Sequence, residues 1–288
     1  PAGLILIQPG MGTASVYIPI FLAMIFVAGV SVKYIMFLIG TGSITIFFTI
    51  LPIWQDKIYH KTIPLIAIFV NSKIRIILLA ALLVITLIAV LGYYIYKNKY
   101  YYWISYVSSM ITLSYFLSFL AGKVLQDYQI MRLIVFINPQ IDPLGSGWNI
   151  IQSKIAIGSG NFLGQGYLQG TQSHYRFLPQ QSTDFIFSIL AEESGFVGGL
   201  SVFLLYLVIM LRILHIMKST KNIYGYYIAS GILAMFFFHF FVNTGMVMGI
   251  MPITGIPLLF LSYGGSSLWT AMIAIGLLMS ISFRHFDY

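Results

Sequence analysis

Residues 122–184, GKVLQDYQIMRLIVFINPQIDPLGSGWNIIQSKIAIGSGNFLGQGYLQGTQSHYRFLPQQSTD, form the one long polar stretch in an otherwise strongly apolar sequence. This segment contains three acidic residues, Asp127, Asp142 and Asp184, out of seven in the chain. Glycines are frequent in its second half, and Asp184 stands where the next apolar run begins. Chemistry that needs polar side chains is therefore expected in this segment or at its borders.

The composition around that segment indicates an integral membrane protein. Hydrophobic residues make up 59% of the chain, charged residues only 8%, and the mean hydropathy is +0.92. Soluble domains carry about 25% charged residues. A bilayer core about 30 Å thick is crossed by about 20 apolar residues of helix, and helices satisfy their own backbone groups in lipid. We therefore predict an all-α, polytopic helix bundle with one large extracytoplasmic loop.

Uncharged runs of sufficient length predict about seven spans. We expect them at residues 14–31, 34–54, 76–96, 100–122 and 185–211, with two more within residues 223–283. The apolar run 63–70 is too short to cross and is interpreted as an interfacial or re-entrant piece. The chain then divides into N-terminal spans at residues 1–121, a large polar loop at residues 122–184, where chemistry is expected, and C-terminal spans at residues 185–288.

The last two spans must be separated by a break. Residues 223–283 contain no Asp, Glu, Lys or Arg, and Gly and Pro accumulate at residues 245–265. Irregular backbone at membrane depth is tolerated only inside the protein or along a cavity. We therefore expect a broken, re-entrant segment there that shapes an interior site.

Basic residues predict the orientation. Arg212, His215, Lys218 and Lys221 mark a cytoplasmic loop by the positive-inside rule, which places residues 122–184 outside. The loop at residues 55–75 disagrees, because it would lie outside with four basic residues against Asp56. The net charge of +8 is spread over short loops. It indicates orientation and contact with anionic lipids, not nucleic-acid binding.

Cofactor motifs are weak or absent in this sequence. Gly158 and Gly160 are followed by Leu163 where a dinucleotide fingerprint needs a third glycine, so no nucleotide is supported. The histidines are scattered, no metal ligand set is assigned, and without cysteine no thiolate chemistry is available. A divalent cation (Mg or Mn) held by Asp142, Asp184, Glu192, Glu193 and pyrophosphate stays open. The glycines either let the segment fold compactly onto the helices or let it close over a substrate.

Asp184 is the leading candidate for catalysis. As a structural residue it would be the N-cap of the helix that begins at Phe185. As a functional residue it would be a carboxylate at the membrane interface, partly desolvated by Phe185 and Phe187, with a raised pKa suited to a general base. Glu192 and Glu193 follow in the same span, and at least one of them should be an interior, partnered group.

The segment's cations Arg132, Lys154 and Arg176 are candidates for binding an anionic headgroup. Arginine offers a two-pronged donor to phosphate, and lysine offers a point charge. Taken singly, each is better interpreted as an interfacial anchor whose charge reaches the headgroups.

The spaced motifs resemble the SEDS (shape, elongation, division and sporulation) family of polymerases. The matching runs are Asp127-Tyr128-Gln129, Asn138-Pro139, Asp142-Pro143-Leu144-Gly145, IQSKIAIGSG at 151–160, TDFIF at 183–187, Glu192-Glu193, NTGM at 243–246 and SYGGS at 262–266. The resemblance covers most of residues 126–282. Relative to that family, residues 55–122 look like a two-span insertion, and the earliest spans are missing. We therefore expect a longer protein of which this is the C-terminal portion.

The resemblance implies a multi-pass protein of the bacterial cytoplasmic membrane. Such a protein is a peptidoglycan glycosyltransferase that polymerises lipid II, a sugar unit carried on polyprenyl pyrophosphate. It works beside a class B penicillin-binding protein. Asp184 matches the family's acid, so we assign it the general base. Lys154, Arg132, Arg176, Gln152, Glu192 and Glu193 become candidate substrate contacts. A flippase for lipid-linked precursors, or a scaffold without catalysis, is the alternative.

Overall fold

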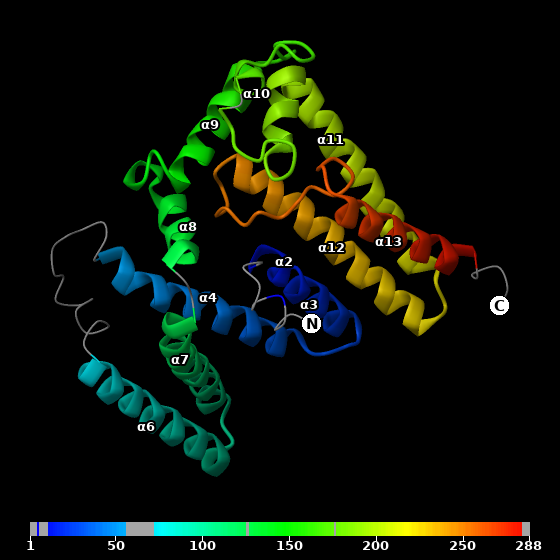
Figure 1. Cartoon of the computed structure of the whole chain (residues 1–288). Coiled ribbons are helices and arrows are strands. Elements are labelled where there is room, and N and C mark those ends of the chain that lie inside the picture. Colours follow the sequence, from blue (N-terminus) through cyan, green and yellow to red (C-terminus); the bar gives the residue numbers. More distant parts are fainter. Residues whose placement is uncertain (1–4, 6–10, 56–71, 125–126, 176, 284–288) are drawn as a thin grey trace. The chain divides into compact units, whose positions relative to one another are not determined.

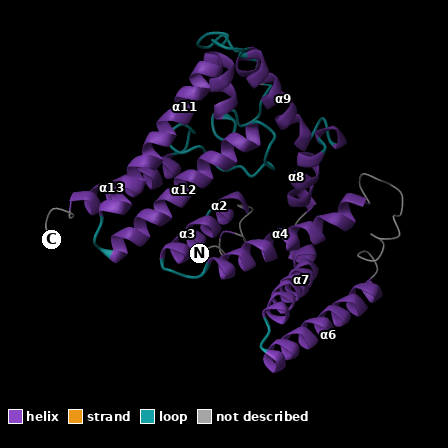
Figure 2. Cartoon of the chain, turned by 180° about the vertical axis from the view of Figure 1, so that it is seen from behind, coloured by secondary structure: helices purple, strands orange, loops and turns teal. Residues whose placement is uncertain are grey.

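The structure, a computed structural model, describes residue 5 and residues 11–55, 72–124, 127–175 and 177–283. These residues form helices joined by loops and turns, with no strand among them (Figures 1 and 2). The chain divides into two compact units. The first comprises Pro1–Val30 and Val135–Tyr288, and the second comprises Ser31–Ile134. The predicted all-α class is confirmed.

The second unit contains three of the predicted spans as long helices. They are α4 (Val32–Trp54), α6 (Ser72–Tyr96) and α7 (Lys99–Val124). α7 packs against both of the others. Hydroxyl groups join the three helices: Thr112 Oγ1 lies 2.8 Å from Thr86 Oγ1 on α6, and Ser114 Oγ donates to the Thr41 carbonyl of α4 at 3.1 Å. In lipid, such hydrogen bonds and close packing replace the hydrophobic effect as the force between helices.

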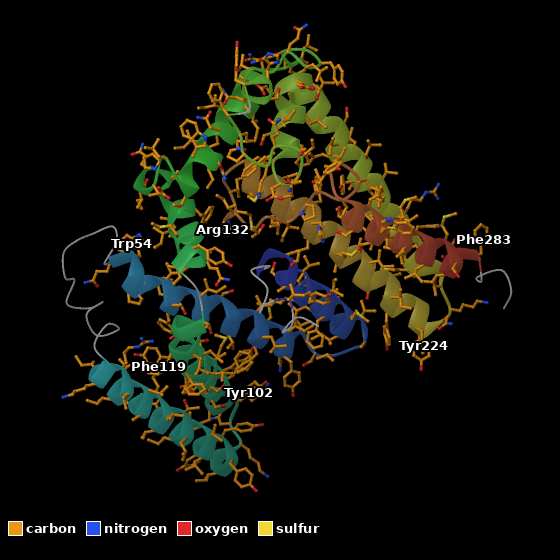
Figure 3. The ribbon with its side chains drawn as sticks, in the orientation of Figure 1. Trp54, Tyr102, Phe119, Arg132, Tyr224 and Phe283 are labelled. Atoms are coloured by element: carbon orange, nitrogen blue, oxygen red, sulfur yellow. The ribbon has the colours of Figure 1, made fainter. Side chains whose placement is uncertain are left out.

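Aromatic residues surround a lysine where α7 begins. Lys33 Nζ lies 5.3 Å from the ring centre of Tyr102 and 5.8 Å from that of Trp103. Tyr106 donates its hydroxyl to the Lys33 carbonyl at 2.6 Å, and Tyr102 is labelled on α7 in Figure 3. Tyrosine, tryptophan and lysine collect at the headgroup level of a bilayer. The expected start of this span at an aromatic interface therefore fits the structure.

The first unit holds the remaining spans. α11 (Ile186–Ser219) packs on α12 (Ile223–Val247), and α13 (Gly265–Phe283) contacts both. In all, six helices within the described residues are long and apolar enough to cross a membrane. The predicted first span, residues 14–31, is shorter than expected because it becomes α2 (Met11–Ser15) and α3 (Tyr17–Val27), an apolar stretch below spanning length.

One predicted boundary is wrong, and one predicted segment lies outside the described residues. The fifth span was expected to end at Leu211, but α11 continues to Ser219, so Arg212 and Lys218 lie on its last turns. Arginine and lysine are good helix formers, and Lys218, in the last turn, is also stabilised by the helix dipole, so neither residue ends the helix. The interfacial run 63–70 lies outside the described residues.

The predicted break between the last two spans is confirmed. Residues 248–264 contain no helix between α12 and α13, and we call them the α12–α13 loop. His239 Nδ1 of α12 lies 2.9 Å from the Pro257 carbonyl, and the Tyr206 hydroxyl of α11 donates to the Leu259 carbonyl. Side chains of the neighbouring helices thus pair the loop's backbone groups, as irregular backbone inside a membrane protein requires.

The polar segment is more helical than a single loop. It contains α8 (Asp127–Ile137), the 3-10 turn η2 (Pro139–Ile141), α9 (Ser146–Ser159) and the short α10 (Thr171–His174). α9 packs against α11 and the end of α12. The later helices of the polar segment, α9 and α10, therefore pack onto the spans of the first unit.

Candidate functional site

Asp184 lies half-buried immediately before α11. The helix has Phe185 as its N-cap, with no side-chain capping bond, so the interpretation of Asp184 as the N-cap is wrong. Phe185 and Phe187 are only 1% and 2% exposed, which places apolar side chains beside the acid in sequence as expected. Asp184 Oδ2 lies close to Gly255, in the α12–α13 loop.

The α12–α13 loop lies beside both an acid and a cation. A Cβ atom placed on Gly255 would lie 3.2 Å from Asp184 Oδ2, and one placed on Gly249 would lie 2.6 Å from Lys154 Nζ. Gly255 has φ +70°, a backbone conformation that favours glycine. The carboxylate and the ammonium group therefore approach the same loop, six positions apart along it.

Ser153 fixes the helix that carries Lys154. Its hydroxyl donates to the Val247 carbonyl at the end of α12, at 2.7 Å, and lies 2.7 Å from the Ser188 hydroxyl on α11. Since Ser153 has one proton, Ser188 is the donor of that pair. The next residue, Lys154, is exposed, whereas Gln152 is 8% exposed. Lys154 is thereby available to a ligand, and Gln152 lies largely inside the protein.

The other two predicted cations, Arg132 and Arg176, are not among the described residues of the first unit. Arg132 lies on α8 in the second unit, where its guanidinium group is 5.6 Å from the ring centre of Tyr128 (Figure 3). Arg176 lies outside the described residues. Both remain predictions as phosphate contacts.

Glu192 has a structural partner. It is 0% exposed, and its carboxylate accepts hydrogen bonds from the Gln172 and Ser173 backbone amides, at 2.8 and 3.2 Å, and from the Thr171 hydroxyl at 3.2 Å. These groups belong to α10, so the carboxylate anchors α10 to α11. Glu193, the next residue, is half-buried. A substrate contact by either glutamate stays a prediction, and Glu192 here contacts the protein's own amides.

The glycine-rich stretch closes a break in α11. Gly195 has φ 65° and ψ −158°, which interrupts the helix. The Gln165 and Gly166 amides donate to the Glu192 and Glu193 carbonyls, and the Phe196 amide donates to the Asn161 carbonyl, each at 3.0 Å. Backbone groups that lose their helical partners are thus paired across the break. Of the two readings of the glycines, this contact supports the compact fold.

Removing the negative charge of Glu192 should loosen the attachment of α10 to α11. Glu192→Gln replaces one acceptor oxygen by a donor, which leaves a half-buried α10 donor without its acceptor at a cost of about 1 kcal/mol. We expect faster cleavage of residues 160–175 by a protease at limiting concentration, because local opening becomes more frequent. Glu193→Gln is the matched control. Equal cleavage rates in the two variants would contradict the anchoring role.

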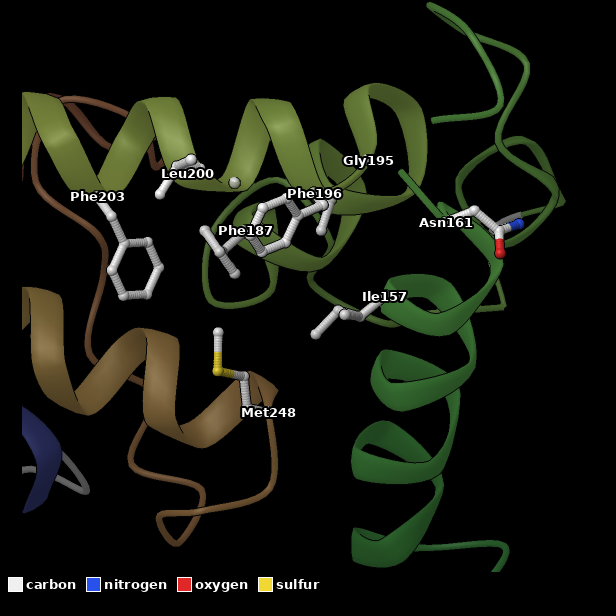
Figure 4. Close-up of a pocket in the computed structure, with 10 residues that line it drawn as sticks. Ile157, Asn161, Phe187, Gly195, Phe196, Leu200, Phe203 and Met248 are labelled. Carbon is white, nitrogen blue, oxygen red and sulfur yellow. The ribbon is translucent and has the colours of Figure 1, made fainter. Parts of the chain in front are cut away.

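An apolar cavity of about 300 Å³ lies between α9, α11 and the end of α12 (Figure 4). Figure 4 shows Phe187 and Phe203 of α11, Ile157 of α9 and Met248 facing one space. Gly195 also lines it, so the break in α11 forms part of its wall. Its lining is suited to hydrocarbon, and Phe187 follows Asp184 by three positions.

A metal centre finds no support in the side chains that the structure describes. Within those ranges no three His, Asp or Glu side chains gather into a group that could hold an ion. Glu192, one of the proposed ligands, is already bonded to α10. The divalent cation stays a prediction from sequence.

Three residues that support this site were not among the predicted site residues: Ser153, and also Asn243 and Ser262, which donate to the Asp184 and Thr183 carbonyls. All three lie within the matching motifs, and Asn243 is a polar amide in a span without formal charge. Buried polar side chains in a membrane span need partners, and this signal could have singled out Asn243.

The fold and the site define a polytopic membrane protein with an acid and a cation at one broken-helix loop. The model of the family described as cell cycle protein (FtsW, RodA, SpoVE) matches residues 54–286, and the chain belongs to this family. The resemblance drawn from the motifs is therefore confirmed.

Named relatives make the comparison more specific. Peptidoglycan glycosyltransferase RodA of Treponema pallidum (strain Nichols) is 56% identical over 284 residues, 99% of this chain and 66% of that protein. Peptidoglycan glycosyltransferase MrdB of Escherichia coli (strain K12) is 45% identical over 173 residues, 60% of this chain and 47% of its own length. The chain thus spans less than two thirds of either relative.

A solved structure shares the fold. It comes from work titled "Structural coordination of polymerization and crosslinking by a peptidoglycan synthase complex". Its chain matches with a TM-score of 0.51 and 19% identity, covering 100% of this chain and 88% of that one. At this identity the likeness supports the helical fold alone.

Proposed function

We propose that this chain is the catalytic part of a peptidoglycan glycosyltransferase that polymerises lipid II outside the cytoplasmic membrane for cell-wall elongation and rod shape. The names of its relatives support the activity. The observation that carries the proposal is the approach of Asp184 and Lys154 to one loop, at Gly255 and Gly249. The reaction requires both kinds of group, a base and a cation.

The reaction joins the 4-hydroxyl of an acceptor sugar to the anomeric carbon of a lipid-linked donor. The hydroxyl oxygen forms the new bond while its proton passes to the Asp184 carboxylate, and the bond from the anomeric carbon to pyrophosphate breaks with inversion. The leaving polyprenyl pyrophosphate carries the negative charge. Lys154 is proposed to stabilise that charge, with Arg132 and Arg176 as further candidates.

The apolar cavity supplies the proposed site for part of the prenyl chain. Phe187, three positions after Asp184, lines it, so we propose that a tail in the cavity and a sugar at the acid belong to one substrate. Hydrocarbon in such a cavity is stabilised by about 25 cal/mol for each Å² removed from water. We propose a class B penicillin-binding protein as the partner that crosslinks the product.

Purified full-length protein incubated with labelled lipid II and its transpeptidase partner in detergent tests the proposal. Glycan ladders are expected on a gel. Flipping requires a sealed bilayer, so neither a flippase nor a scaffold would make this product. Absence of product from folded, partner-bound protein under these conditions would contradict the proposed activity.

A further inference from the structure

The residues around Asp184 are held in place by an unusual set of hydrogen bonds. The carbonyls of Ser182, Thr183 and Asp184 each accept one bond from the region of α12 and the α12–α13 loop. The Tyr263 amide donates to Ser182 at 2.8 Å, and the Ser262 hydroxyl donates to Thr183 at 2.6 Å. Asn243 Nδ2 donates to the Asp184 carbonyl at 2.9 Å. Every peptide carbonyl of this short run is therefore paired.

Asn243 connects Asp184 to the α12–α13 loop, which the Asp184 carboxylate approaches. The same Nδ2 also donates to the Ile256 carbonyl at 2.7 Å, next to Gly255. Carbonyl oxygens only accept, so both N–H groups of the amide are committed and its orientation is determined. Asn243 is 0% exposed, and its Oδ1 has no hydrogen-bond partner among the described residues. The donor half of the side chain is thus the half that the fold uses.

Ser262 performs a similar task along the loop. Its hydroxyl accepts the Leu258 amide at 2.7 Å and donates to Thr183. Both functions of the hydroxyl therefore connect the loop to the residue before the acid.

We infer that Asn243, assisted by Ser262, is a positioning residue that sets the location of the Asp184 carboxylate for proton transfer. This inference rests on the proposed function. Asn243 touches the backbone of Asp184 and of Ile256 in the α12–α13 loop. It would therefore affect the reaction by setting the position of the acid. A displacement of about 1 Å in a reacting group lowers a rate by about 10²-fold.

Asn243→Asp tests the inference with an almost isosteric side chain. It replaces the two donors by an acceptor that faces two carbonyls. We expect kcat for lipid II polymerisation by the full-length protein with its partner to fall about 10–100-fold, with KM changed by less than about threefold. Thr244→Val is the matched control on α12, since the Thr244 hydroxyl bonds only within its own helix, to the Phe240 carbonyl at 2.7 Å. It should polymerise within about twofold of wild type.

A double variant separates positioning from general loss of structure. If Asn243 acts through Asp184, then Asn243→Asp adds no further loss in an Asp184→Asn background, because effects through one group are not additive. Where the residual rate of Asp184→Asn is below detection, the split between kcat and KM in Asn243→Asp decides.

A second pair guards against misfolding. Ser262→Ala should lower kcat in the same way, and Ser262→Thr, which keeps the hydroxyl, should restore part of it. A full further loss in the Asp184→Asn background, or a loss carried by KM, would overturn the inference and leave the glycosyltransferase proposal standing. A wild-type rate for Asp184→Asn would overturn both.

Discussion

Asp184→Asn is expected to lower the rate of lipid II polymerisation by about 10²–10⁴-fold. The amide keeps the shape of the side chain and its place against Gly255, but it cannot accept the proton of the acceptor hydroxyl. Binding of lipid II should change little, because the cavity and Lys154 are untouched. The measurement is the initial rate of glycan formation by the full-length protein with its partner.

Asp184→Glu provides a control for chemistry against geometry. It restores a carboxylate but moves it by one methylene toward the α12–α13 loop. An intermediate rate is expected, above that of Asp184→Asn and below wild type. Equal rates for wild type and Asp184→Asn, with both proteins folded, would remove the base from the proposed mechanism.

Gly195→Ala is expected to destabilise the protein by about 2–6 kcal/mol, the sum of backbone strain and overpacking. The dihedral angles at Gly195, φ 65° and ψ −158°, are nearly restricted to glycine. A Cβ atom there would lie 2.3 Å from the Gly164 amide nitrogen, which is backbone and cannot turn aside. The check is the midpoint of thermal unfolding in detergent, together with protease sensitivity of residues 160–175.

Gly199→Ala is the matched control one turn further along α11. A Cβ atom at that position would meet only the Phe187 ring, at 3.6 Å, an ordinary contact. Alanine also favours a helix over glycine by up to about 1 kcal/mol. We expect Gly199→Ala to unfold near or above the wild-type temperature. If Gly195→Ala also unfolded near or above the wild-type temperature, the break in α11 would not be required for stability.

Long, uncharged runs made most of the fold predictable. α4, α6, α7, α12 and α13 follow from hydropathy and length, because lipid leaves helices as the main solution for such runs. The end of α11 is not predictable from charge alone, because Arg212 and Lys218 lie on its last turns and not in a loop. The break at Gly195 was not predicted, because its free backbone groups find partners in residues 160–166, which are distant in sequence.

The chemistry of the site was more predictable than its geometry. Asp184 and Lys154 were selected as a base and a cation, and both lie against the α12–α13 loop. Glu192 was selected for its charge, yet its carboxylate binds α10, a helix too short to be predicted from periodicity. Asn243 was overlooked as a site residue because its role depends on two carbonyls that only the fold brings to it.

The most direct measurement is an experimental structure of the full-length protein with lipid II bound. The account predicts the acceptor 4-hydroxyl about 2.6–3.2 Å from an Asp184 carboxylate oxygen. It also predicts the donor pyrophosphate beside Lys154 and Gly249. An acceptor sugar on the far side of the α12–α13 loop, with its hydroxyl paired to another side chain, would contradict the account.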